Sequence, residues 1–153
     1  MAASPALGSA APEIDLPGWH DGRVQQFRLS KQRGKTTVLA FYPGDDTPVC
    51  TKQMCSYSTD LADLQEVGGQ IWGISAQDVA SHQAFAVKRG ITLPLLADPA
   101  KKAIKAYGVG GLLAVKRSVF VVDGDGIIRW AHVSALGLTF RDSKTLVGVL
   151  AAL

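Results

Sequence analysis

The chain has 153 residues, of which 47% are hydrophobic and 19% charged, and its net charge is +3. These values predict one globular domain over residues 1–153 and exclude a disordered or coiled-coil protein. The basic residues are scattered and no apolar run approaches 18 residues, so we expect neither a nucleic-acid nor a membrane partner. The N-terminus shows no signal pattern, and we expect a cytoplasmic protein.

The N-terminal part of the sequence predicts an irregular arm and then two strands. Pro12, Pro17 and Gly18 are turn and loop signals, so the arm is expected to lack regular structure. A weak alternation at 25–29 predicts a short strand. The unbroken β-branched and apolar run TTVLAF at 36–41 predicts a strand that is buried on both faces.

The middle of the sequence predicts alternation of helix and strand. Apolar residues at spacings of three and four predict a helix over 49–67, which Gly68 and Gly69 end. The run QIWGIS at 70–75 predicts a second buried strand. An amphipathic helix is predicted over 78–89, with Gly90 after its end.

The last third of the sequence predicts a hairpin and a closing helix. A short apolar stretch at 94–96 and helical turns at 101–107 precede a strand at 118–122. Asp-Gly-Asp-Gly at 123–126 is a strong hairpin signal, and 127–132 is expected to return antiparallel.

The final helix is predicted over 141–153, capped by Thr139 or Asp142. Helical crossovers imply parallel neighbouring strands, whereas the hairpin adds an antiparallel pair. The predicted fold class is therefore α/β, with a mixed central sheet flanked by helices in a thioredoxin-like architecture.

The two cysteines, Cys50 and Cys55, are the first candidate functional residues. A secreted, disulfide-stapled fold has more cysteines, spread along the chain. A structural zinc needs four ligands, and His20, His82 and His132 show no ligand spacing, so no metal is expected. Each histidine is interpreted as a surface or a hydrogen-bonded structural residue. Two close cysteines in a reducing compartment instead indicate redox chemistry.

Cys50 falls in the first turn of the predicted helix. Free backbone N–H groups and the positive end of the helix dipole lie there, and both favour the reactive thiolate. Position alone also fits a small buried hydrophobic residue. The neighbours favour a functional interpretation, because the Thr47 hydroxyl can donate and accept, and Pro43 and Pro48 stiffen the loop.

Pro43, Thr47 and Cys50 match the P-x-x-x-T-x-x-C motif, and the chain thereby resembles the peroxiredoxins. The longer phrase FYPGDDTPVCTKQMC resembles the bacterioferritin-comigratory-protein branch, also called peroxiredoxin Q, in which a second cysteine follows the first by five residues. The segments LPLLADPAKKAIKAYGV and RSVFVVDGDGIIR extend the resemblance over nearly the whole chain.

The resemblance implies a role for each matched residue. Cys50 would be the peroxidatic nucleophile, and Thr47 would hydrogen-bond the thiolate and the incoming peroxide. Arg117 would keep the thiolate ionised and stabilise charge on the peroxide oxygens. Pro43 would shield the thiolate, and the N–H groups of Val49 and Cys50 would orient the substrate.

The resemblance also implies a catalytic cycle. Cys50 would become a sulfenic acid on reaction with hydrogen peroxide or an organic hydroperoxide, and Cys55 would then form a disulfide with it. Five helical residues separate Cα atoms by roughly 8.6 Å, whereas a disulfide needs about 7 Å or less. The start of the helix would therefore unwind, unless Cys55 is a bystander. A thioredoxin-type dithiol would reduce the disulfide in a monomeric protein without an organic cofactor.

One residue departs from the family pattern, and three other functions compete with this interpretation. Gln53 stands where the branch usually has Glu, so the hydrogen-bonding capacity remains but the charge is lost. A thiol–disulfide exchange protein would generally carry C-x-x-C, which is absent. A metal-binding module would need further ligands nearby, and a cysteine hydrolase would need a paired histidine that no motif links to Cys50.

Overall fold

The computed structural model describes residues 4–111, 114–134 and 140–153. Seven strands form one sheet in the order β2-β1-β5-β4-β3-β6-β7. The strands are β1 (Asp15–His20), β2 (Arg23–Arg28), β3 (Thr36–Phe41), β4 (Gly69–Ser75), β5 (Leu95–Ala97), β6 (Ser118–Val122) and β7 (Ile128–Val133). Strands β3, β4 and β5 run parallel, whereas the remaining pairs are antiparallel. The predicted mixed sheet is therefore confirmed.

Strand β3 lies near the middle of the sheet and is buried on both faces, as its continuous apolar sequence predicts. Val38 and Ala40 pack into the hydrophobic cluster on one face. Leu39 and Phe41 pack into the cluster on the other face. The alternation of a strand thus connects two cores through one rigid element.

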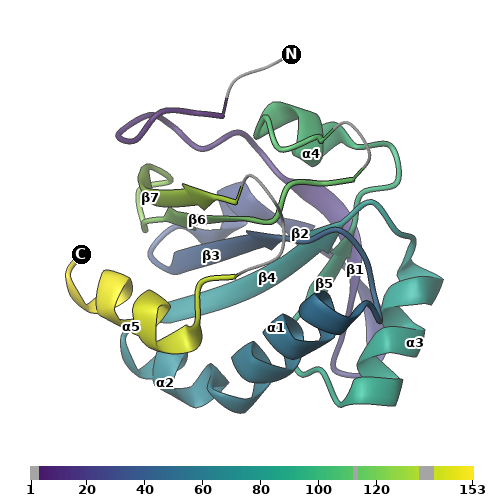
Figure 1. Cartoon of the computed structure of the whole chain (residues 1–153). Coiled ribbons are helices and arrows are strands. Elements are labelled where there is room, and N and C mark those ends of the chain that lie inside the picture. Colours follow the sequence, from purple (N-terminus) through teal and green to yellow (C-terminus); the bar gives the residue numbers. More distant parts are fainter. Residues whose placement is uncertain (1–3, 112–113, 135–139) are drawn as a thin grey trace.

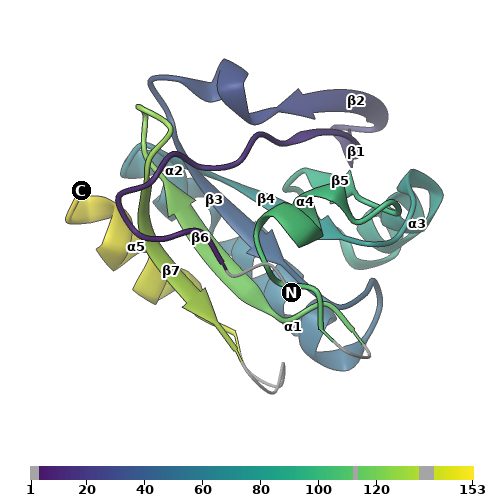
Figure 2. The ribbon, with the colours of Figure 1, turned by 90° about the horizontal axis from the view of Figure 1, so that it is seen from above.

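The helices cover both faces of the sheet (Figure 1). They are α1 (Pro48–Thr59), α2 (Leu61–Glu66), α3 (Val79–Arg89), α4 (Lys102–Ala106) and α5 (Ser143–Ala151). Helices α1, α2, α3 and α5 contribute to the first cluster, and α4 contributes to the second. Seen from above, α4 and the N-terminal segment lie over the other face (Figure 2). No helix in the described part of the chain is long and apolar enough to cross a membrane.

The predicted irregular arm contains a regular strand, β1, which corrects the interpretation of Pro17 and Gly18. Both residues pair in register with β2, opposite Gln26 and Gln25. The β1–β5 ladder begins only at Gly18, so Pro17 faces no second partner there. A Cβ at Gly18 would lie 2.7 Å from the carbonyl oxygen of Leu95. The glycine is needed for close strand approach and does not break the strand.

The strand predicted at 25–29 is β2, which covers Arg23–Arg28 and ends before Leu29. Leu29 begins a short 3-10 helix, η1 (Leu29–Gln32). Its side chain is buried and its N–H donates to the carbonyl of Ile14. Burial of Leu29 therefore turns the chain away from the sheet.

The single helix predicted over 49–67 is two helices, separated at Asp60. Asp60 has φ −99° and ψ 14°, outside the helical range. The residues before it include Ser56, Ser58 and Thr59, whose side chains compete for backbone hydrogen bonds. The Thr59 hydroxyl donates to the carbonyl of Cys55 at 2.9 Å. The break allows α2 to pack against β4.

The predicted hairpin is confirmed, with its second strand shifted by one residue, and the closing helix is confirmed with shorter bounds. The carboxylate of Asp123 accepts hydrogen bonds from the N–H groups of Asp125 and Ile127, which fixes the turn. Helix α5 is capped by Asp142, which accepts from the Thr145 N–H at 2.8 Å. The other candidate cap, Thr139, lies outside the described residues.

Candidate active site

The loop between β3 and α1 places Cys50 in the first helical turn. Thr47 is extended, with φ −85° and ψ 153°, because a residue before proline disfavours the helical conformation. Pro48 is the first helical residue, a position where its missing N–H costs nothing. The sequence Thr-Pro therefore fixes the helix start, and Cys50 follows as the third helical residue.

The backbone at this helix start places N–H groups beside Cys50 that have no partner within the helix. The first hydrogen bond of the helix runs from the N–H of Thr51 to the carbonyl of Thr47, at 2.8 Å. The N–H groups of Val49 and Cys50 precede that bond and point out of the helix end. The Cys50 side chain is 0% exposed, so interactions with it are only weakly screened by water.

Arg117 contacts Cys50, although 67 residues separate them in sequence. Ser118 opens β6 and pairs with Phe41 at the end of β3, which brings Arg117 to the loop before α1. Its Nη2 donates to the Cys50 Sγ at 3.0 Å, and its Nη1 donates to the Gln53 Oε1 at 2.5 Å. Arg117 is 3% exposed. It therefore places one positive charge directly against the thiol.

Gln53 continues a chain of hydrogen bonds away from the thiol. Its Nε2 donates to the Tyr57 hydroxyl at 3.2 Å, and that hydroxyl donates to the carbonyl of Arg141 at 2.6 Å. Burial raises the pKa of Tyr57 to about 12, so the hydroxyl remains a donor. The amide of Gln53 orients Arg117 without neutralising it, whereas a Glu at this position would add a negative charge.

The two other predicted site residues lie in the loop. The Thr47 hydroxyl donates to the carbonyl of Gly44 at 3.1 Å. A hydroxyl has one hydrogen, so Thr47 is left with lone pairs that can accept from a second molecule. Pro43 is partly buried between Tyr42 and Gly44.

Cys55 lies in the same helix as Cys50, and both thiols are free. Cys55 is partly exposed, and its Sγ lies 3.8 Å from the carbonyl oxygen of Arg89. The intact helix therefore keeps the two thiols apart, as the spacing predicts.

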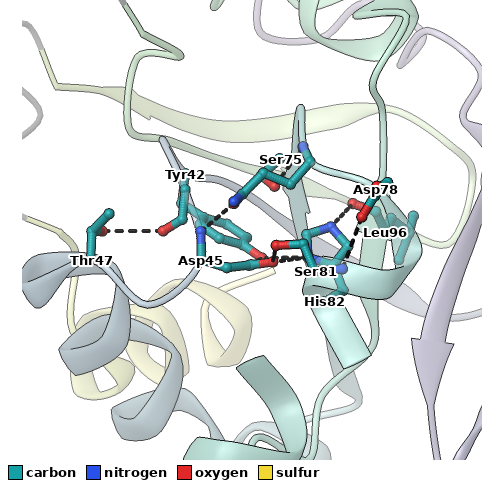
Figure 3. A network of polar contacts seen from close by, with 10 residues as sticks. Tyr42, Asp45, Thr47, Ser75, Asp78, Ser81, His82 and Leu96 are labelled. Atoms are coloured by element: carbon teal, nitrogen blue, oxygen red, sulfur yellow. Dashed lines mark hydrogen bonds and ion pairs between the residues drawn. The ribbon is translucent and has the colours of Figure 1, made fainter. Parts of the chain in front are cut away.

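A second polar network, which sequence reasoning missed, lies beside the loop (Figure 3). The Asp45 carboxylate accepts from the Tyr42 hydroxyl at 2.6 Å and from the Ser81 hydroxyl at 2.8 Å. His82 Nδ1 lies 2.7 Å from the same carboxylate. His82 is a hydrogen-bonded structural histidine, as expected. The available signal was its place on the buried face of α3 with Phe85 and Ala86, where a polar residue needs a partner.

Among the residues that the structure describes, no group of three or more His, Cys, Asp or Glu side chains could hold a metal ion. The polar groups gathered around Cys50 are hydrogen-bond donors and one guanidinium. Such an arrangement can ionise a thiol and stabilise negative charge on an oxygen that approaches it.

Comparison with protein families gives a match that covers most of the chain. The model of the AhpC/TSA family matches residues 7–131. The chain therefore belongs to the AhpC/TSA family.

The individual relatives of this chain include proteins named peroxiredoxin Q. "Peroxiredoxin Q, chloroplastic" of Triticum aestivum is 38% identical over 128 residues, which are 82% of this chain and 58% of the wheat protein. This chain thus spans less than two thirds of the length of the wheat protein. A putative peroxiredoxin of Mycobacterium tuberculosis is 34% identical over 140 residues, covering 85% of this chain and 87% of that protein. The resemblance seen in the sequence is confirmed.

Solved structures share the fold. AhpC of Enterococcus faecalis superposes with a TM-score of 0.88 at 25% identity, covering 95% of this chain and 90% of that one. The reduced 2-Cys peroxiredoxin of Plasmodium vivax gives the same TM-score at 24% identity, covering 95% and 94%. The predicted thioredoxin-like architecture is therefore the fold of this family.

Proposed function

We propose that the chain is a thiol-dependent peroxidase that reduces hydrogen peroxide and organic hydroperoxides at Cys50. The contact that carries this proposal is the 3.0 Å hydrogen bond from Arg117 Nη2 to the Cys50 Sγ, in the first turn of α1. A buried guanidinium and a helix N-terminus both favour the thiolate over the thiol. Membership of the AhpC/TSA family supports the same chemistry.

In the first step the Cys50 thiolate attacks one oxygen of the peroxide bond. The S–O bond forms as the O–O bond breaks, and the leaving alkoxide or hydroxide takes up a proton as alcohol or water. Arg117 and the N–H groups of Val49 and Cys50 stabilise the developing negative charge. Thr47 accepts a hydrogen bond from the peroxide hydroxyl, since its own proton is donated to Gly44. Pro43 shields the thiolate from water.

In the second step the Cys55 thiol condenses with the Cys50 sulfenic acid and releases water. Both residues belong to the continuous helix α1, so the segment between them unwinds first. The unwinding frees the thiols to approach within disulfide distance. An external dithiol of the thioredoxin type then reduces the disulfide and is itself oxidised.

The cycle suits a single-domain monomer, because both cysteines belong to one chain. It also requires a reducing compartment that returns the cysteines to thiols, and we propose the cytoplasm. Hydroperoxide and dithiol are the proposed partners, and the residues that act on them are Pro43, Thr47, Cys50, Cys55 and Arg117.

The test is a stopped-flow measurement of the reduced protein with hydrogen peroxide, beside the Cys50→Ser variant. We expect rapid peroxide consumption by the wild type and none by the variant. Equal reactivity of the two proteins, or no reaction of either, would overturn the proposal. Size-exclusion chromatography with light scattering tests the monomer.

A further inference from the structure

The loop before α1 is attached to α3 through the buried side chains of Asp45 and His82. The two side chains are 3% and 0% exposed, and they join at 2.7 Å between Asp45 Oδ2 and His82 Nδ1. The loop belongs to the site described above, whereas α3 carries none of the residues proposed to act there. His82 of α3 thus holds the loop that leads into α1, the helix that carries Cys50.

The partners of His82 define its protonation. Its Nε2 lies 2.8 Å from the carbonyl oxygen of Leu96 in β5, which can only accept, so Nε2 carries a hydrogen. Its Nδ1 faces the Asp45 carboxylate, which already accepts from Ser81 and Tyr42. Both ring nitrogens therefore face acceptors, and the ring is assigned as an imidazolium paired with a carboxylate.

Tyr42 supplies the remaining donor and keeps its proton. Burial raises the pKa of Tyr42 well above its usual value of 10.0, and the neighbouring Asp45 carboxylate raises it further. Its hydroxyl also lies 3.3 Å from His82 Nδ1. The groups that contact His82 are therefore Tyr42 at the end of β3, Asp45 in the loop and the carbonyl of Leu96, and Ser81 contacts the Asp45 carboxylate (Figure 3).

We propose that Asp45 and His82 form a buried charged pair that positions residues 44–47 for the reaction at Cys50. His82 is itself fixed by β5, so the pair transmits the position of the sheet to the loop. Gln77, just before α3, adds a contact because its Oε1 accepts from the N–H of Asp45. With Asp45 held, the carbonyl of Gly44 and the Thr47 hydroxyl that donates to it are held as well. Asp45 and His82 are positioning residues, and the inference rests on the proposed peroxidase reaction.

Asp46 provides a matched control, because the same change can be made at the adjacent carboxylate. Asp46 forms surface ion pairs with Lys88 at 2.7 Å and with Arg89 at 2.8 Å, and both basic residues lie at the end of α3. Its φ is +58°, a conformation that asparagine also tolerates. Asp45→Asn and Asp46→Asn thus differ mainly in whether the lost charge is buried and paired with His82.

The kinetic test compares the rate of Cys50 oxidation by hydrogen peroxide in reduced proteins whose circular dichroism matches the wild type. We expect Asp45→Asn and His82→Gln each to lose about tenfold or more, since small displacements of reacting groups cost up to about 100-fold. We expect Asp46→Asn to remain within about twofold. The double variant should lose no more than the worse single variant, because paired residues are not additive. Folded single variants with wild-type rates, an equal loss in Asp46→Asn, or additive losses would overturn the pair.

A second measurement needs no variant. In reduced wild-type protein labelled with ¹⁵N-histidine, both ring nitrogens of His82 should show the chemical shifts of protonated nitrogens near neutral pH. A His82 ring with one unprotonated nitrogen would overturn the charged pair. If wild-type protein failed to react with peroxide while His82 gave the expected shifts, the proposed function would fail and the charged pair would stand.

Discussion

Helices α1 and α3 pack against the same hydrophobic cluster but are built in opposite ways. Helix α3 is capped at its start by Asp78, which accepts from the Ser81 N–H, and it ends at Gly90 in the left-handed conformation. Helix α1 has no side-chain cap among the described residues, and the Thr47 hydroxyl donates to the carbonyl of Gly44. A missing cap costs about 1 kcal/mol of helix stability. The helix with the cysteines is therefore the weaker of the two.

A further weakness of α1 lies between its cysteines. The Thr51 Oγ1 is buried without a hydrogen-bond partner among the described residues. An unsatisfied buried hydroxyl costs about 1–3 kcal/mol, which unwinding of this turn would relieve. The stable helix α3 thus holds the loop in place, whereas the less stable helix α1 can unwind. A disulfide between Cys50 and Cys55 requires this unwinding.

The largest expected effect tests whether α1 opens at all. In Cys55→Ser, the first reaction with peroxide should proceed at the wild-type rate, whereas thioredoxin-driven turnover should be lost, because no disulfide can form. Single-turnover stopped flow and a coupled thioredoxin assay measure the two steps. Sustained turnover of this variant with thioredoxin alone would show that Cys55 is a bystander.

The next effect concerns the positive charge of Arg117, which contacts Cys50 in the intact helix α1. Arg117→Met should lower the rate of Cys50 oxidation by about 100-fold, the usual effect of removing one preorganised donor. Stopped-flow kinetics measure the rate, and urea unfolding verifies that the variant is folded. A folded variant within about threefold of the wild type would remove Arg117 from the proposed mechanism.

A smaller effect sharpens the contrast by strengthening α1. Thr51→Val keeps the shape of the side chain and removes the unpaired hydroxyl. Disulfide formation after oxidation should slow by about fivefold, equivalent to about 1 kcal/mol of added helix stability, and sulfinic overoxidation of Cys50 should rise. Mass spectrometry after peroxide pulses measures both products. Faster disulfide formation in Thr51→Val than in the wild type would show that the substitution does not stabilise α1.

The smallest effect concerns the surface contact between the loop and α3. Hydrogen bonds from Lys88 and then Arg89 hold the pKa of Asp46 below its usual value of 3.8. A carboxyl group whose pKa is lowered by folding stabilises the fold at pH values above its pKa in the unfolded chain. This contribution is lost as the pH falls through the pKa of the group in the folded protein. Asp46→Asn should therefore slightly lower the urea midpoint at about pH 6 but leave it unchanged at about pH 2.5. Equal losses at both values would exclude an electrostatic origin.

The sequence by itself determined most of the elements and indicated Cys50 as the candidate nucleophile. The continuous apolar run of β3, the Asp-Gly-Asp-Gly turn and the Thr-Pro start of α1 each act locally, so their structure can be read from neighbouring residues. It predicted Pro17 and Gly18 wrongly as a loop, since the strand partner that makes a glycine necessary, Leu95, lies far along the chain. Asp60 was missed because a helix break depends on what α2 then packs against.

Only the tertiary structure decided which distant side chains meet. Arg117 reaches Cys50 because β6 pairs with β3, although the family motif had already indicated the residue. His82 reaches Asp45 because α3 follows β4 on the face that also carries α1, and no motif indicated this contact. Local sequence specifies backbone conformation, whereas the protonation and partners of a buried group depend on atoms that only packing brings together.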